Sequence, residues 1–291
     1  MTSVKPTRPS ELRQLLDSLG FHPSRALGQN FLIDGNIRNI ILDAAAVSDK
    51  DSVLEVGAGP GVITVPLVDS AQSVVAVEKD PRLAGYLQSL LRDRANFRLI
   101  EEDVLRIDLN GLLAEASWIV VANLPYSIAG RLLVDLAGSA HRPRRMLVMV
   151  QLEVADRLRA QPGSKAYGVL SVLVGLRYKL NVVRKISPTC FWPRPAVWSA
   201  VVSMEAIESD VTPDAPDLFR KLVRYAFSQR RKQLGGILAG NGNPLRVSGE
   251  DVSRTLEALD LESSRRPETL APVTWCRLAN KLGEAANPRN G

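Results

Sequence analysis

A short run of residues combines hydrogen-bond acceptors, a stiff turn and an aromatic ring: Val121-Ala122-Asn123-Leu124-Pro125-Tyr126. The side-chain oxygen of Asn123 and the carbonyl of Leu124 can both accept hydrogen bonds from one amino group, which directs the nitrogen lone pair toward an electrophile. Pro125 fixes its own φ and stiffens the turn, and Tyr126 offers a face for an unstacked base. This chemistry suits methylation of an exocyclic amino group on a nucleic-acid base, without a strong general base.

A glycine-rich turn lies upstream of this run, directly after an apolar segment at residues 52–56 that we expect to be a strand. Its three glycines alternate with other residues: Gly57, Gly59 and Gly61. Such a turn lets the backbone approach a cofactor closely. Glu78 ends the next expected strand, residues 73–77, where a carboxylate can hold ribose hydroxyls. The glycine spacing is one residue more compact than the dinucleotide pattern, which favours S-adenosylmethionine over NAD.

A second acid follows the third expected strand, residues 97–100. Asp103 could accept a hydrogen bond from the adenine amino group of the same cofactor. Each feature alone has a simpler interpretation, because glycine turns occur throughout doubly wound folds and acids often cap helices at strand ends. The order of the features favours a methyltransferase: glycine turn, ribose acid, third-strand acid, and then Asn123 after a fourth strand at residues 118–121.

The elements around these residues alternate between apolar strands and amphipathic helices. This pattern predicts an α/β, doubly wound (Rossmann-like) parallel sheet over residues 24–207, which we expect to be an S-adenosylmethionine-dependent methyltransferase domain. Ligands of such sheets bind beyond the carboxyl ends of the strands, where Gly57, Glu78, Asp103 and Asn123 all fall. Further strand regions are expected at residues 146–150, 169–176, 180–183 and 199–204.

The two ends of the chain are expected to differ from this domain. Ser, Asp, Pro and Thr cluster at residues 208–216 and predict a boundary. Expected helices at 217–239, 248–259 and 273–282 then form a small helical domain, residues 208–291. Residues 1–23 are expected to be an N-terminal extension, with a helix over residues 10–19 that Ser10 caps.

The chain resembles the ribosomal RNA adenine N6-dimethyltransferases, in particular the branch that acts on the small-subunit 16S RNA. The resemblance covers nearly all of residues 24–235. It departs at Ser127, where the family commonly has a second Asn, and at Arg25, where the family is more basic. The following motifs carry it: Leu27-Gly28-Gln29-Asn30-Phe31-Leu32, Glu55-Val56-Gly57-Ala58-Gly59-Pro60-Gly61, Val77-Glu78, Asp103-Val104, Asn123-Leu124-Pro125-Tyr126, Met149-Val150-Gln151-Leu152-Glu153-Val154-Ala155, Phe191-Trp192-Pro193-Arg194-Pro195-Ala196-Val197-Trp198-Ser199 and Phe227-Ser228-Gln229-Arg230-Arg231-Lys232.

The resemblance implies roles for individual residues. The cofactor implied is S-adenosyl-L-methionine, bound by Asn30, Leu32, Gly57, Glu78, Asp103 and Asn123. The catalytic residues implied are Asn123, Leu124 and Tyr126, with Tyr126 and Phe191 holding the target base. The reaction implied is N6-dimethylation of two adjacent adenosines in a 3′-terminal hairpin loop of 16S rRNA within the small subunit, by a monomer.

Composition and charge agree with an RNA partner. The net charge is +6, and residues 130–205 contain 12 Lys and Arg against four Asp and Glu. We expect the phosphate-contacting face in this segment. Its candidate cations are Arg142, Arg144, Arg145, Arg157, Arg159, Lys179, Arg184, Lys185 and Arg194. Cys190 and Cys276 are too few for a disulfide framework, so a reducing, cytoplasmic location is expected. Neither a structural metal nor a membrane span is expected.

Two other functions remain open on the sequence. The first is the antibiotic-resistance branch of the same chemistry, which methylates an adenosine of the large-subunit 23S rRNA and usually has a shorter, more basic C-terminal region. The second is a non-catalytic assembly factor that keeps the fold and binds the maturing small subunit. The presence of Glu78, Asn123 and Tyr126 favours an active enzyme over the second alternative.

Overall fold

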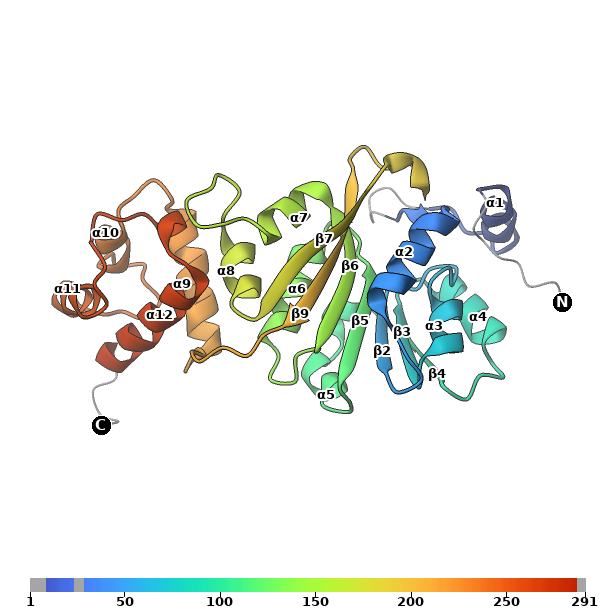
Figure 1. Cartoon of the computed structure of the whole chain (residues 1–291), viewed down its shortest axis with the longest axis horizontal. Helices are drawn as coiled ribbons and strands as arrows, with labels where there is room; N and C mark the ends of the chain where they lie inside the picture. Colours follow the sequence, from blue (N-terminus) through green and yellow to red (C-terminus); the bar gives the residue numbers. More distant parts are fainter. Residues whose placement is uncertain (1–8, 24–28, 287–291) are drawn as a thin grey trace. The chain divides into compact units, whose positions relative to one another are not determined.

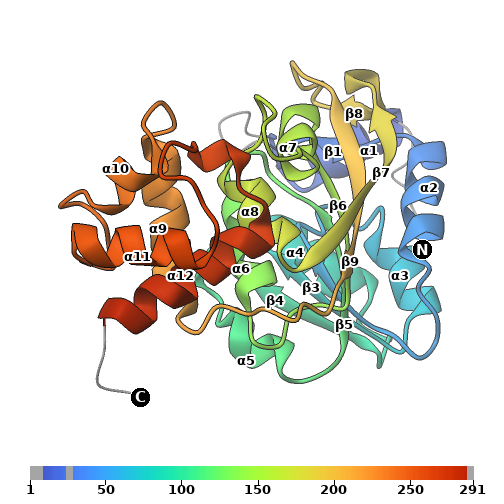
Figure 2. The same ribbon diagram turned by 60° about the vertical axis from the view of Figure 1, so that its left-hand side comes forward.

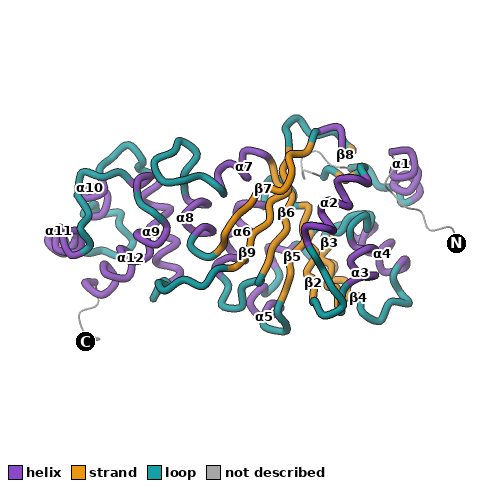
Figure 3. Tube along the Cα trace, viewed as in Figure 1, coloured by secondary structure: helices purple, strands orange, loops and turns teal. Residues whose placement is uncertain are grey.

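Seven strands form one sheet, in the order β4-β3-β2-β5-β6-β9-β7 (Figures 1 and 3). The computed structural model describes residues 9–23 and 29–286. Neighbouring strands among β4, β3, β2, β5 and β6 are parallel, whereas β9 is antiparallel to β6. The sheet is therefore mixed, although the sequence predicted a parallel sheet. The strands span β2 Ser52–Val56, β3 Ser73–Glu78, β4 Phe97–Glu101, β5 Trp118–Asn123, β6 Arg145–Gln151, β7 Tyr178–Ile186 and β9 Ser199–Ala206.

Helices cover both faces of this sheet. Val53, Ile119 and Leu147 pack with α2 (Gly35–Ala45) and α3 (Thr64–Ser70) in one core cluster. The residues that follow them along the strands, such as Val120 and Val148, are equally buried, and α6 (Ala129–Gly138) lies behind the sheet in Figure 1 where α2 lies in front. Burial on both faces confirms the doubly wound α/β class. The remaining elements nearby are α4 Pro81–Leu90, η1 Val104–Arg106, α5 Leu109–Leu113, α7 Leu152–Leu158 and η2 Pro188–Cys190.

The N-terminal helix α1 (Pro9–Ser18) packs against a two-stranded ribbon of β1 (Phe31–Leu32) and β8 (Phe191–Trp192), which are labelled in Figure 2. Two fully buried α1 side chains, Leu12 and Leu16, share a cluster with Phe21, Phe31 and Leu83. The described part of the predicted extension, residues 9–23, is thus anchored to the β1–β8 ribbon and to α4 (Pro81–Leu90). The predicted cap at Ser10 is wrong, because the described helix already begins at Pro9.

The chain divides into two compact units. The sheet unit comprises the described residues up to Ala155 and Lys179–Ala206, and the helical unit comprises Asp156–Tyr178 and the described residues from Ile207 onward. The last passage of the chain between the units, after Ala206, falls next to the predicted boundary. The segment Asp156–Tyr178 was expected in the methyltransferase domain but packs with the C-terminal helices. The elements of the helical unit are α8 Val169–Gly175, α9 Pro216–Ser228, α10 Leu234–Leu238, α11 Gly249–Ala258, η3 Pro267–Thr269 and α12 Pro272–Ala286.

Aromatic contacts explain why Asp156–Tyr178 belongs to the helical unit. The Tyr167 hydroxyl donates to the carbonyl of Leu270 at 2.7 Å, and the Phe227 ring lies 6.0 Å from the ring centroids of both Tyr167 and Trp275. The expected strand region at 169–176 is wrong, since these residues form helix α8. A short apolar run buried on all sides cannot be assigned to strand or helix from its periodicity alone.

The expected helix over residues 217–239 is also interrupted. Helix α9 ends at Ser228, and α10 begins only at Leu234. The amide of Leu234 donates to the carbonyl of Arg265 at 2.7 Å, and that of Gly235 to the carbonyl of Ser263 at 3.0 Å. These hydrogen bonds hold the start of α10 against residues 263–265. The helical periodicity of the sequence cannot predict such contacts between distant segments.

Replacing Tyr167 with Phe is expected to destabilise the protein by about 1–2 kcal/mol, because the buried Leu270 carbonyl loses its donor. Urea unfolding would measure the loss. Tyr225→Phe is the matched control, because its hydroxyl makes no hydrogen bond within the described residues. Equal stability of the two variants would show that the hydrogen bond from Tyr167 to Leu270 contributes nothing to stability, contrary to this prediction.

Candidate active site

A cavity of about 280 Å³ lies at the carboxyl ends of the parallel strands, within the sheet unit. It lies where the turn after β2 and the ends of β3 and β5 meet, at the position where open α/β sheets bind ligands. Within residues 9–23 and 29–286, no group of three His, Cys, Asp or Glu side chains could hold a metal ion. The predicted site residues that line the cavity are Asn30, Gly57, Glu78, Asp103, Asn123, Leu124 and Tyr126.

The glycine turn after β2 forms one wall of the cavity. Gly57 has a φ of +77° and Gly59 a φ of +56°, a left-handed region that disfavours other residues. A Cβ atom on Gly57 would lie 3.1 Å from the carbonyl oxygen of Asn123, and one on Gly59 would lie 3.2 Å from the ring of Phe31. A side chain at Gly57 would therefore crowd the end of β5, so the turn brings bare backbone to the cavity.

Glu78, at the end of β3, holds this turn in place. Its carboxylate accepts from the amide of Gly59 at 2.8 Å and from the amide of Asp80 at 2.9 Å. Burial raises the pKa of Glu78, and the two backbone hydrogen bonds oppose that rise. The carboxylate is thus fixed at the cavity wall with lone pairs left over, as recognition of a vicinal diol requires.

Asp103, beyond the end of β4, forms an ion pair that the sequence did not predict. One carboxylate oxygen accepts from the Lys79 ammonium at 2.8 Å, and the other accepts from the amide of Leu105 at 3.0 Å. The hydrogen bond from Lys79 is the main cause of the lowered pKa of Asp103. Lys79 also lines the cavity. Its position directly after Glu78 was the only signal available in the sequence.

Asn123, at the end of β5, has a defined amide orientation. Its Nδ2 donates to the carbonyl of Asn30 at 3.1 Å, across 93 positions of the sequence. The Oδ1 atom makes no hydrogen bond within the described residues, so it remains available as an acceptor. Leu124, whose amide donates to the carbonyl of Met149 at 3.2 Å, continues the same wall. Two acceptors, Asn123 Oδ1 and the Leu124 carbonyl, thus belong to residues lining one cavity.

Tyr126 is held by a partner that lies 73 residues further along the chain. Its hydroxyl lies 3.0 Å from Ser199 Oγ, the first residue of β9. The ring is half-buried, and burial raises the pKa of its hydroxyl. A hydroxyl tethered in this way leaves the ring as the part of Tyr126 that a ligand can contact. Ser199 belongs to one of the motifs that carry the family resemblance, but the sequence alone predicts no role for it.

Two predicted site residues have side chains outside the cavity. Leu32 and Phe191 pair across the β1–β8 ribbon, and both are buried in the main core cluster. Neighbouring residues of the ribbon alternate in direction, and Phe31 lines the cavity in place of Leu32. Any contact of Leu32 with a cofactor would come from its backbone. Phe191 is a core aromatic residue in this structure and does not line the cavity.

Comparison with known families decides the classification. Residues 20–251 match the family described as ribosomal RNA adenine dimethylase. The chain belongs to this family. A protein named ribosomal RNA small subunit methyltransferase A from Clostridium perfringens is 36% identical over 277 residues, covering 94% of this chain and 96% of the relative. One of the same name from Geobacillus thermodenitrificans is 38% identical over 280 residues, covering 94% and 96%.

Solved structures agree with the fold. A dimethyladenosine transferase from Plasmodium falciparum superimposes with a TM-score of 0.73 at 25% identity, covering 87% of this chain and 98% of that one. The 23S rRNA methyltransferase ErmE superimposes with a TM-score of 0.63 at 24% identity, covering 87% and 99%. The likeness to ErmE supports the fold alone. The protein is accordingly a ribosomal RNA adenine dimethyltransferase with a Rossmann-like fold.

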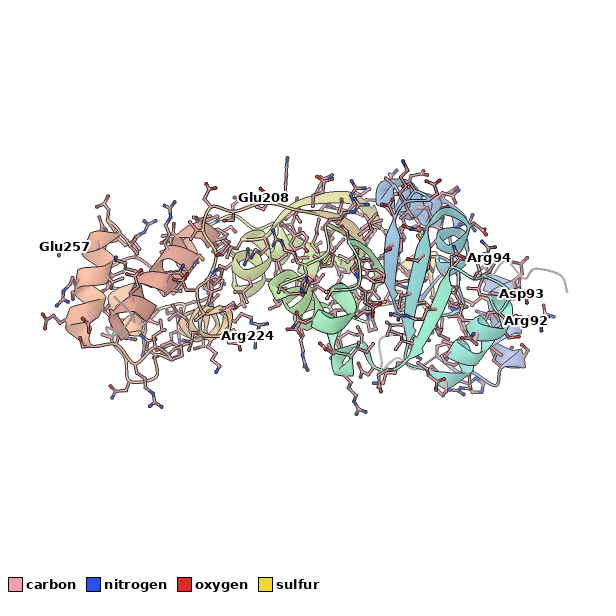
Figure 4. All side chains as sticks on the ribbon, turned by 90° about the horizontal axis from the view of Figure 1, so that it is seen from below. Arg92, Asp93, Arg94, Glu208, Arg224 and Glu257 are labelled. Atoms are coloured by element: carbon pink, nitrogen blue, oxygen red, sulfur yellow. The ribbon has the colours of Figure 1, made fainter. Side chains whose placement is uncertain are left out.

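The ion pairs on the surface of this dimethyltransferase reduce the number of cations that remain candidates for contacting phosphates. Many cations are already paired, such as Arg94 with Asp69 at 2.7 Å, on the turn labelled in Figure 4. Among the predicted cations, Arg144 pairs with Asp51 and Arg159 with Asp156. Those that are exposed and make no ion pair within the described residues are Lys179, Arg184 and Lys185 on the edge strand β7, and Arg194 after β8.

Glu55, in the dimethyltransferase's glycine motif, is expected to make stability depend on pH. Burial raises the pKa of this carboxyl to about 8, with a contribution from Glu78. The folded state then binds more protons than the unfolded state between pH 4.5 and about 8, so stability falls as pH rises through this window, by up to about 1.4 kcal/mol per pH unit.

Comparing the unfolding free energies of wild type and Glu55→Gln across this range isolates the effect. The amide variant is expected to gain stability relative to wild type from pH 5 to pH 8, because it carries no charge to bury. Glu115→Gln, a change at an exposed ion-paired residue, is the control. A constant difference between Glu55→Gln and wild type would contradict a neutral Glu55 at pH 7.

Proposed function

We propose that the protein transfers methyl groups from S-adenosyl-L-methionine to N6 of two adjacent adenosines in a 3′-terminal hairpin loop of 16S rRNA, within the small ribosomal subunit. The observation that carries the proposal is the fixed amide of Asn123, whose oxygen is left as an acceptor at the cavity. The names of the relatives from Clostridium perfringens and Geobacillus thermodenitrificans support the small subunit as substrate.

The residues at the cavity fit the proposed cofactor. The left-handed glycine turn exposes backbone at positions where a Cβ atom would be crowded. The fixed carboxylate of Glu78 suits the ribose hydroxyls, and that of Asp103 suits the adenine amino group. Asn30, Gly57, Asn123 and the backbone of Leu32 would hold the remainder. When bound, the cofactor supplies a methyl group on a positively charged sulfur.

The protein's own contribution is to orient the target amine. Asn123 Oδ1 and the carbonyl of Leu124 accept from the two N6 hydrogens, which favours a tetrahedral nitrogen with its lone pair in line with the methyl group. The Tyr126 ring stacks on the adenine, which contributes about 1–3 kcal/mol per base. Neither acceptor is a strong base. The carbon–nitrogen bond would form as the carbon–sulfur bond breaks and leaves a neutral thioether, and the methylated, positively charged N6 would then release its proton to solvent.

The remaining parts of the proposal concern the RNA and its setting. Single-stranded loops allow bases to be splayed out and stacked, which matches a cavity at the surface of the sheet unit. Lys179, Arg184, Lys185 and Arg194 would contact phosphates. We infer a monomer that acts on the small subunit in the cytoplasm. In the described part of the chain, no helix is long and apolar enough to cross a membrane.

Mass spectrometry of methylated nucleosides tests this function. Undermethylated small and large ribosomal subunits are each incubated with the protein and S-adenosylmethionine. N6,N6-dimethyladenosine in the small subunit alone is the expected result. Product in the large subunit alone would assign the protein to the resistance branch, and product in neither would favour a non-catalytic assembly factor.

A further inference from the structure

Two large apolar side chains are unusually exposed in the loop between β8 and β9. Val197 is 43% exposed and Trp198 is 51% exposed, the highest values among the large apolar residues that the structure describes. Trp118 and Trp275, by contrast, are buried. The Trp198 indole makes no hydrogen bond, ring contact or ion contact within the described residues. An exposed aromatic face with no intramolecular role is typical of a binding surface.

The backbone holds Trp198 next to the candidate active site. Its carbonyl accepts from the amide of Leu152 at 2.9 Å. The next residue, Ser199, pairs with Gln151 and lies 3.0 Å from the Tyr126 hydroxyl through its side chain. Because β9 is antiparallel to β6, it begins at the edge where the parallel strands end. Trp198 therefore lies at the same edge of the sheet as the cavity, one residue before Ser199, which contacts the cavity-lining Tyr126.

The same loop carries an unpaired positive charge. Arg194 is exposed and makes no ion pair within the described residues. Pro193 and Pro195 flank it and restrict its backbone. An exposed indole and a free guanidinium in the same loop fit a nucleotide, whose base stacks on the ring and whose phosphate pairs with the cation. A purely apolar protein partner would bury the guanidinium without compensation.

We propose that Trp198 is a stacking platform for the base of a nucleotide that flanks the target adenosine in single-stranded RNA, with Arg194 contacting its phosphate. The inference rests on the proposed function and deepens it. Tyr126 holds the base being methylated, and Trp198 holds the base of a neighbouring nucleotide. The RNA loop is thereby kept open, with the two bases unstacked from each other. Trp198 then contributes to RNA binding and leaves cofactor binding and the chemical step unchanged.

Fluorescence titration of the full-length protein with a single-stranded oligoribonucleotide containing adjacent adenosines tests the platform directly. Stacking on Trp198 is expected to quench its emission. Trp198→Ala is expected to lose this quenching and to bind the RNA about 10-fold more weakly, while Trp198→Phe stays within about 3-fold of wild type. Leu90→Ala removes another exposed apolar side chain and is the matched control. Wild-type affinity and quenching in Trp198→Ala would overturn the proposal.

Steady-state kinetics on undermethylated small subunits separate this inference from the proposed function. Trp198→Ala is expected to raise KM for the subunit about 10-fold, with kcat and cofactor affinity unchanged. A fall in kcat with constant KM would overturn the platform. If wild type methylates no subunit, the proposed function fails, whereas the oligonucleotide titration still decides on Trp198. Weaker binding to subunits but not to the oligonucleotide would indicate a protein contact and also overturn the proposal.

Discussion

Replacing Asn123 with Ala is expected to lower kcat for methylation by about 100- to 1,000-fold, the cost of removing one group that is aligned with the transition state. The variant loses the Oδ1 acceptor, so the target amine keeps its planar form and its lone pair is not directed at the methyl group. Methylation of undermethylated small subunits measures kcat, and binding of the same subunits is expected to remain unchanged.

Asn123→Asp is the matched variant for this prediction. It keeps an acceptor oxygen but loses the Nδ2 donor to the carbonyl of Asn30, so two oxygens would face each other there. We expect intermediate activity, together with weaker cofactor affinity because the Asn30 segment is displaced. Methylation by Asn123→Ala at the wild-type rate would refute the role assigned to this residue.

Replacing Glu78 with Gln is expected to weaken cofactor binding by about 100-fold or more. The amide cannot accept from both Gly59 and Asp80, so one amide nitrogen must face a backbone N–H, at a cost of about 1–3 kcal/mol. At least one acceptor for the ribose is lost as well. Isothermal titration with S-adenosylmethionine measures the affinity, and thermal unfolding measures the accompanying loss of stability.

Glu102→Gln provides the control for Glu78, because Glu102 also lines the cavity but is exposed and lies outside the glycine turn. We expect its cofactor affinity to stay within about 3-fold of wild type, as for a solvent-screened charge. Glu78→Gln with unchanged affinity would show that the carboxylate serves only to hold the turn, and the stability measurement would then carry its whole effect.

The local sequence determined much of the site. The strand before Gly57, the strand that ends at Glu78 and the strand that ends at Asn123 can each be predicted, because their apolar runs are short and bounded by turn residues. Parallel strands bring their carboxyl ends to one edge, so the convergence of these residues follows from their order along the chain. Motifs of the glycine turn and of Asn123 to Tyr126 carried the family resemblance as well.

Only the tertiary structure decided which distant groups meet. The Asn123 amide is oriented by Asn30, 93 residues away, and Tyr126 is tethered by Ser199, 73 residues away. The family resemblance implies that Phe191 contacts the target base, whereas its side chain lies in the core. The apolar residues of α8 predicted a strand but form a helix. The segment that contains α8 packs in the helical unit, where Tyr167 donates a hydrogen bond to Leu270. The periodicity of apolar residues indicates which way side chains point within one helix or strand. Contacts between distant residues depend instead on how the helices and strands pack against one another, and the local pattern of residues contains no information about that packing.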